Sequence, residues 1–128
     1  MMKSNNRGQA IVEFALILPI LILLVMGILE FGLFFHSYVN ISFASKEAAR
    51  LAALDANASS QSIAASVQAT MPATRNITIT LTPAAPRTTG LPVTVSVSTQ
   101  HTFMTPVISV LAPSNPYTIS SSTTARSE

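Results

Sequence analysis

Hydrophobic and polar positions divide the chain into zones with different periods. A short polar start, 1–8, is followed by an apolar run, 9–35. The stretch 10–29 alone supplies the roughly 20 apolar residues that a helix needs to cross a bilayer. This run therefore predicts a membrane-spanning helix with its transmembrane part at 10–35.

The next zone, from Ser37 to Met71, is rich in alanine and serine and contains no glycine or proline. We therefore expect the first helix to continue to about Asp55, which gives a rod of roughly 65–70 Å that extends beyond the membrane. Ile63, Val67 and Met71 are spaced four residues apart and are followed by a proline, so they predict a short second helix.

Beyond the second helix, apolar and polar residues alternate with a period of two. The segments 76–82 and 92–99 each place three aliphatic side chains on one face, and 101–111 and 116–124 are expected to supply further strands. The predicted fold is an α+β membrane protein with a long N-terminal helix, a short second helix and a C-terminal antiparallel sheet of three or four strands. The sheet is expected to pack on the protruding helix. The predicted parts are a leader at 1–8, the long helix at 9–55 and a small α+β region outside the membrane at 56–128.

Composition excludes several classes of function. Only 9% of residues are charged, against about 25% in ordinary soluble domains, and the net charge of +2 does not suggest a nucleic-acid partner. The chain has no cysteine, and His36 and His101 lie far apart without nearby carboxylates at metal-ligand spacing. No nucleophile–base grouping or glycine-rich phosphate loop is present. We expect no catalytic residue, no metal, no cofactor and no enzymatic activity.

The start of the apolar run combines a small residue with a carboxylate. Gly8 ends a short leader that contains Lys3 and Arg7, Gln9 begins the run, and Glu13 stands fifth after the glycine. This arrangement resembles the prepilin-peptidase site of type IV pilins and pseudopilins. The resemblance implies that a membrane-embedded aspartyl peptidase cleaves between Gly8 and Gln9.

Glu13 calls for an explanation, because an ionised carboxylate in hydrocarbon costs roughly 2.5–3.5 kcal/mol even on insertion scales. Cleavage before Gln9 would create a positively charged α-amino group one helical turn away. Pairing Glu13 with that amine, or with the amine of a neighbouring subunit, would offset the desolvation of both charges and favour side-by-side helices. The alternative is that Glu13 lies at the membrane interface and reaches water.

The likeness extends beyond the leader, and the first 55 or so residues resemble the TadE-like family, the minor pseudopilins of the Tad (tight adherence) system. Its members typically have a Gly-x-x-x-x-Glu-Phe start, a proline inside the helix, a second Glu-Phe-Gly, and then a segment like Ala-Arg-Glu-Gly-Ala-Arg. The matching positions here are Gly8 with Glu13 and Phe14, Pro19, Glu30 to Gly32, and Ser45 to Arg50. The chain departs from the pattern at Lys46 and Ala48, where arginine and glycine are usual.

The family resemblance implies a single-pass protein of the bacterial inner membrane that helps to assemble an adhesive Flp pilus. Incorporation of the protein into the extracellular pilus is compatible with this resemblance. The implied partners are the lipid bilayer, the prepilin peptidase, other pilins through the N-terminal helix and the Tad inner-membrane assembly platform. Lys3 and Arg7 before the span favour a cytoplasmic N-terminus and a periplasmic C-terminal region.

Glu30 is a second carboxylate in the apolar run, 17 residues after Glu13, which is roughly 25 Å along a helix. This distance places it near the outer edge of the hydrocarbon. Gly27 and Gly32 flank it and would allow close approach of another helix. Two interpretations stay open: contact with a partner helix of another pilin, and an interfacial carboxylate hydrated from the periplasm.

Two further interpretations of the whole chain compete with the minor pilin. In one, the protein is an uncleaved membrane-anchored accessory of a pilus or secretion apparatus. In the other, residues 1–35 are a secretory signal and the remainder is a free binding module. The length of the apolar run exceeds the 7–15 residues of a signal core, and Glu13 lies inside it, which argues against the signal.

Overall fold

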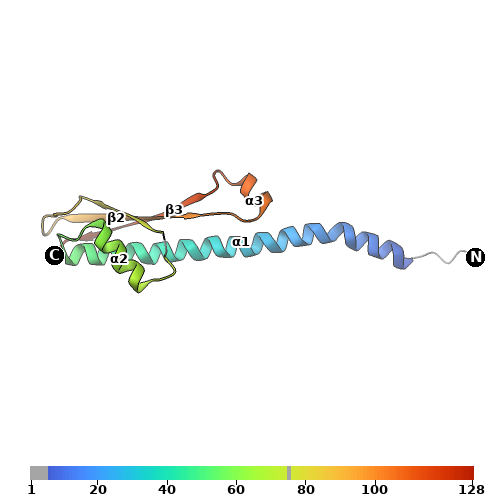
Figure 1. Ribbon diagram of the computed structural model, residues 1–128, viewed down its shortest axis with the longest axis horizontal. Helices are drawn as coiled ribbons and strands as arrows, with labels where there is room; N and C mark the ends of the chain where they lie inside the picture. The colour runs from blue at the N-terminus through green and yellow to red at the C-terminus, as the bar shows by residue number, and fades with distance from the viewer. Residues whose placement is uncertain (1–5, 75) are drawn as a thin grey trace, which may run out of the picture.

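One long helix carries a small sheet and a second helix along its C-terminal half, while its N-terminal half extends beyond the rest of the protein (Figure 1). The computed structural model describes residues 6–74 and 76–128, so residues 1–5 of the predicted leader lie outside the described part. The elements are α1 (Asn6–Leu54), α2 (Ser60–Thr70), β1 (Thr78–Thr82), β2 (Pro92–His101), α3 (Pro106–Leu111) and β3 (Tyr117–Arg126). The predicted α+β fold, with a long helix, a short helix and a C-terminal antiparallel sheet, is confirmed.

The helix α1 is continuous over 49 residues and accommodates Pro19 inside it. It is long and apolar enough to cross a membrane, and the most apolar 18-residue window has no buried residue. Its end at Leu54 agrees with the predicted end near Asp55.

The C-terminal half of α1 presents a face of small residues to the sheet. Spacings of three and four residues bring these positions onto one side of the helix. The buried set is Ile41, Ala44, Ser45, Ala48, Ala49 and Ala52. Because most of these side chains are alanine or serine, the helix backbone can lie close to the sheet.

The sheet has three antiparallel strands in the order β1-β2-β3. In the register, Ile79 pairs with Val97, and Val97 pairs in turn with Ser121. One face of the sheet covers α1, and the alternation predicted from the sequence is confirmed, since its aliphatic residues are all buried. These are Ile77, Ile79, Leu81, Val93, Val95 and Val97.

The second helix, α2, adds a smaller layer against α1 and β1. It begins after Ser59, whose hydroxyl accepts a hydrogen bond from the Ser62 N–H at 3.2 Å, a common N-cap arrangement. Ile63 and Val67 are its buried residues, and Met71 follows as the half-buried C-cap. The predicted stripe of this helix is confirmed.

The prediction of a strand over 101–111 is wrong beyond His101. Residues 106–111 form the short helix α3, which lies in the connection between β2 and β3. Pro106 stands at its start, where a proline's fixed φ suits a helix and its missing N–H costs nothing. A short apolar run does not distinguish helix from strand by its period.

The far end of α1 is closed by a buried arginine from the β1–β2 loop. Arg87 is 7% exposed, and its guanidinium donates to the carbonyl oxygens of Ala52, Asp55 and Ala58. The main-chain N–H of Glu128 donates to the Ala53 carbonyl at 3.0 Å. The donors to Ala52 and Ala53 satisfy carbonyls of the last turn of α1, which the end of a helix leaves without helical partners.

Candidate functional site

The predicted processing site lies at the beginning of α1. Gly8 and Gln9 are in its first turns and are exposed, as is Glu13. The Gln9 side-chain amide donates to Glu13 Oε1 at 3.1 Å, so the helix brings these two residues together across one turn. The neighbouring Phe14 is 61% exposed. The carboxylate therefore lies beside the residue that would carry the new amine if the chain were cut after Gly8.

Glu30 differs from its surroundings, because it is 5% exposed in a part of α1 whose large side chains are mostly exposed. The connection between β2 and β3 covers its carboxylate. The main-chain N–H groups of Met104 and Thr105 both donate to it, the latter at 3.0 Å from Oε2. The partners of Glu30 in the structure thus belong to its own chain, and a contact with another pilin stays a prediction.

These partners of Glu30 carried no signal in the sequence. They are main-chain donors, which every residue except proline supplies, and they lie 74 and 75 positions away. The side chains of Met104 and Thr105 do not identify them.

An aromatic cluster lies beside Glu30 and joins α1 to the ends of β2 and β3. The Phe34 ring is 5.5 Å from the His101 ring, 6.0 Å from Phe103 and 5.8 Å from Tyr117, measured between centroids. These distances are typical of favourable ring pairs. Three neighbouring rings on α1 are instead largely exposed, namely Phe31, Phe35 and Tyr38. Phe34 therefore packs within the protein, while the other rings remain available to lipid or a partner.

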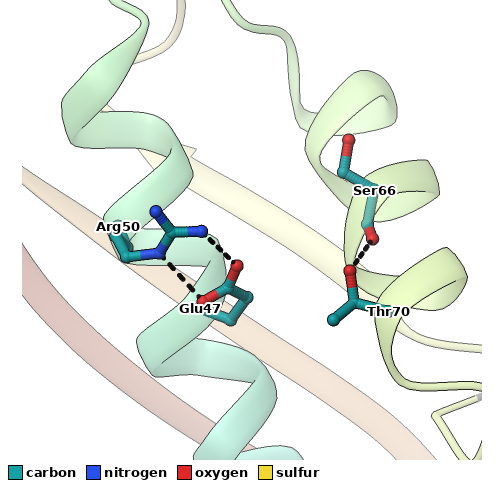
Figure 2. Close-up of polar contacts among 4 residues, drawn as sticks. All are labelled: Glu47, Arg50, Ser66 and Thr70. Carbon is teal, nitrogen blue, oxygen red and sulfur yellow. Dashed lines mark hydrogen bonds and ion pairs between the residues drawn. The ribbon is translucent and has the colours of Figure 1, made fainter.

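The segment 45–50 divides its residues between two faces of α1. Ser45 faces the sheet, where its hydroxyl lies 3.2 Å from Ser121 Oγ and 2.9 Å from Thr123 Oγ1. On another face, the Arg50 guanidinium donates twice to the Glu47 carboxylate, at 2.7 and 3.0 Å. Figure 2 shows this pair on α1, with α2 beside it. The hydrogen bonds from Arg50 lower the pKa of Glu47.

The two histidines take part in packing and local hydrogen bonding. His36 Nε2 lies 3.0 Å from the side-chain amide nitrogen of Asn40, one turn along α1. His101 belongs to the aromatic cluster and lies 5.2 Å from the Phe103 ring. Within residues 6–74 and 76–128, no group of three or more His, Cys, Asp or Glu side chains is placed to hold a metal ion.

Comparisons with known proteins bear on the N-terminal helix. Comparison with curated proteins and with solved structures gives no match. A family model described as TadE-like protein matches residues 8–50. The matched segment contains all the predicted processing and assembly residues, which are Gly8, Gln9, Glu13, Phe14 and Glu30. The family is associated with the pilus and is not an enzyme family. The predicted resemblance is thus confirmed over residues 8–50, where α1 is similar to TadE-like proteins, a family associated with the Tad pilus.

Proposed function

We propose that this protein is a minor pilin or pseudopilin that a prepilin peptidase cleaves between Gly8 and Gln9 and that takes part in assembling an adhesive Flp pilus. Before assembly, α1 anchors the chain in the bacterial inner membrane. Its N-terminus lies in the cytoplasm and its α+β region in the periplasm. The family match and the exposed apolar half of α1 support this proposal.

The observation that carries the proposal is the proximity of Gln9 and Glu13. Their side chains already meet at 3.1 Å across one turn, so an amine on the Gln9 backbone would lie within one turn of the carboxylate. An unpaired charge is costly at this depth, and pairing with the amine of the same or an adjacent subunit reduces the cost. Glu13 and Phe14 then set how neighbouring α1 helices pack.

The exposed apolar surface of α1 serves two partners in turn. It faces lipid while the protein is anchored, and it faces the N-terminal helices of other pilins once a filament forms. Transfer from one environment to the other requires the peptidase and the Tad inner-membrane assembly platform. Glu30 has its ligands within the chain, so in this proposal its contribution to assembly is to hold the α3 region against α1.

One observation favours a second candidate, the uncleaved membrane-anchored accessory. The helix begins at Asn6, so the Gly8–Gln9 bond lies inside its first turns. A peptidase would have to unwind this turn, whereas an anchor would leave it intact. The unwinding is inexpensive, because the first N–H groups of a helix have no helical partner and glycine is a poor helix former.

The two candidates are separated by the intact mass of the membrane-extracted protein, measured with and without a working prepilin peptidase. The minor pilin predicts loss of Met1 to Gly8 only when the peptidase is present. An unchanged mass in both strains would refute processing and favour the uncleaved anchor.

Two variants sharpen the experiment. A Cβ added at Gly8 meets no atom within 4 Å, so Gly8→Ile tests recognition by the peptidase without disturbing the fold, and we expect it to stay uncleaved. Glu13→Gln should still be cleaved but should assemble poorly, because an amide cannot pair with the new amine. Assembly of Glu13→Gln at the wild-type level would contradict the pairing.

A further inference from the structure

The connection between β2 and β3, residues 102–116, exposes an unusual amount of apolar surface. We call it the hairpin tip. Met104 is 85% exposed, Val110 83% and Leu111 78%. Between Arg87 and Arg126 the sequence contains no Asp, Glu, Lys or Arg, so the hairpin tip itself carries no charged side chain. Clustered exposed apolar side chains mark a surface that contacts something other than water.

The hairpin tip is held beside a defined part of α1. The Glu30 carboxylate accepts the N–H groups of Met104 and Thr105. One turn before Glu30, a Cβ at Gly27 would lie 3.9 Å from Ile108 Cδ1, so α3 packs close to the helix backbone. Both contacts fall inside the transmembrane part 10–35. Gly27 is three residues before Glu30, about 4.5 Å along the helix axis, which places the tip slightly within the outer boundary of the hydrocarbon.

We propose that the hairpin tip is a second membrane contact, which dips into the outer leaflet of the bilayer that α1 spans. This inference rests on the membrane insertion of α1 in the proposed function. The apolar side chains of α3 face acyl chains, and Glu30 fixes the tip at this depth. Segments that bind in the interface bury their apolar face about 5–10 Å into the headgroup and acyl boundary, which agrees with the level of Gly27.

A groove at the same level is suited to lipid. It has a volume of about 410 Å³ and opens between α1 and the hairpin tip. Its lining is largely aromatic and aliphatic and includes Phe31, Phe34, Phe103, Leu111, Pro113 and Tyr117. The one carboxylate in its wall, Glu30, is already bonded to the tip, so a charged group of a protein partner would find no free counter-charge there. An acyl chain needs none, and we therefore assign the groove and the tip to lipid.

The absence of cysteine from the chain makes the proposal directly testable by single labels. Val110→Cys and Leu111→Cys place a label on the hairpin tip at side chains that are mostly exposed. Ser122→Cys is the matched control, because Ser122 is exposed on the face of β3 that points away from α1. Ile22→Cys marks the middle of the span. Each full-length variant carries a bimane fluorophore and is reconstituted alone in phosphatidylcholine–phosphatidylglycerol vesicles.

Quenching of the tip is measured with lipids that carry a nitroxide near the top of the acyl chain, quenching of Ile22 with lipids that carry it near the end of the acyl chain, and all positions are tested separately with aqueous iodide. We expect lipid quenching at both tip positions to be several-fold stronger than at Ser122, and iodide quenching to be several-fold weaker. Iodide quenching at the tip equal to that at Ser122, with Ile22 quenched only by lipid, would overturn the tip contact and leave the span intact. Protection of the tip only in assembled pili would also overturn it and would assign the surface to a neighbouring subunit. Failure of lipid to quench Ile22 would overturn the insertion of α1 itself.

Discussion

Replacing Arg87 with methionine is expected to destabilise the docking of the β1–β2 loop on the end of α1. Methionine keeps much of the length and volume of the side chain but has no donor. Arg87 is 7% exposed and donates to the carbonyl oxygens of Ala52 at 3.0 Å and Ala58 at 3.1 Å, and also to that of Asp55. The Asp55 carbonyl keeps a second donor, the Ala58 N–H at 3.2 Å. The variant therefore removes the Arg87 donor from the carbonyls of Ala52 and Ala58. Unlike the Asp55 carbonyl, these two have no second donor among the described contacts at this end of α1.

The size of the effect follows from these two bonds. A hydrogen bond to a charged group contributes about 1.5–3 kcal/mol, and a cation at a partly buried helix C-terminus adds up to about 2 kcal/mol. Methionine does not carry the free-energy cost of burying a charged guanidinium, and this gain offsets part of the loss. We expect Arg87→Met to lower the free energy of unfolding by about 2–4 kcal/mol, which raises the unfolded fraction by roughly two orders of magnitude.

The assay is pulse proteolysis of the full-length chain in mild detergent over a urea series, which reports the population of the open α+β region. Arg126→Met is the matched control, because Arg126 is exposed and donates once, to the Gly90 carbonyl at 2.7 Å. We expect it to cost less than about 1 kcal/mol, and Arg87→Lys to fall between the two. If the urea concentration at the midpoint of unfolding is no lower for Arg87→Met than for Arg126→Met, the proposed role of Arg87 is refuted.

Two further predictions concern the segment 45–50 of α1, one on each of the two faces that it occupies. Ser45→Ala removes the partner shared by Ser121 and Thr123 and should lower the free energy of unfolding by about 1–2 kcal/mol in the same urea series. Replacing all three hydroxyls together should recover part of this loss, because no buried hydroxyl is then left without a partner. A triple variant less stable than the single one would contradict this. Arg50 lowers the pKa of Glu47, so the pair stabilises the fold above the ordinary glutamate value of 4.5, and the contribution is lost as pH falls through the lower folded pKa. On acidification below this value, the melting temperature of Glu47→Gln should therefore fall less than that of wild type, by a small margin because Arg50 is exposed. Identical dependence of the melting temperature on pH in the two proteins would refute the contribution of the Glu47–Arg50 pair.

The predicted elements that proved correct depend on local periodicity. The end of α1 and the stripe of Ile63 and Val67 follow from helix propensity and spacing over neighbouring residues. The two aliphatic strands follow from strict alternation. The strand prediction for residues 106–111 was wrong because a six-residue stretch with four aliphatic side chains suits either structure. Contacts from Glu30, on a distant part of the chain, fix the residues just before this helix.

The candidate site divides in the same way. Gly8, Gln9 and Glu13 lie within one or two turns, so their spacing alone places them together on a helix. The sequence also marks Glu30 as unusual, because a carboxylate interrupts an apolar run. Its ligands could not be predicted, since they are main-chain groups brought to it by the return of β2 and β3 along α1.

The sequence by itself therefore determined the apolar rod, its start motif, the helix that follows and the alternating strands, since each is encoded by residues a few positions apart. The tertiary structure alone decided what the buried charges bind. Arg87 lies in the loop between β1 and β2, yet it closes the end of α1, and Glu30 lies in the apolar run of α1, yet it holds the hairpin tip. The physical reason is that a buried charge must find donors or acceptors wherever the folded chain presents them, and backbone groups carry no trace of that choice in the sequence.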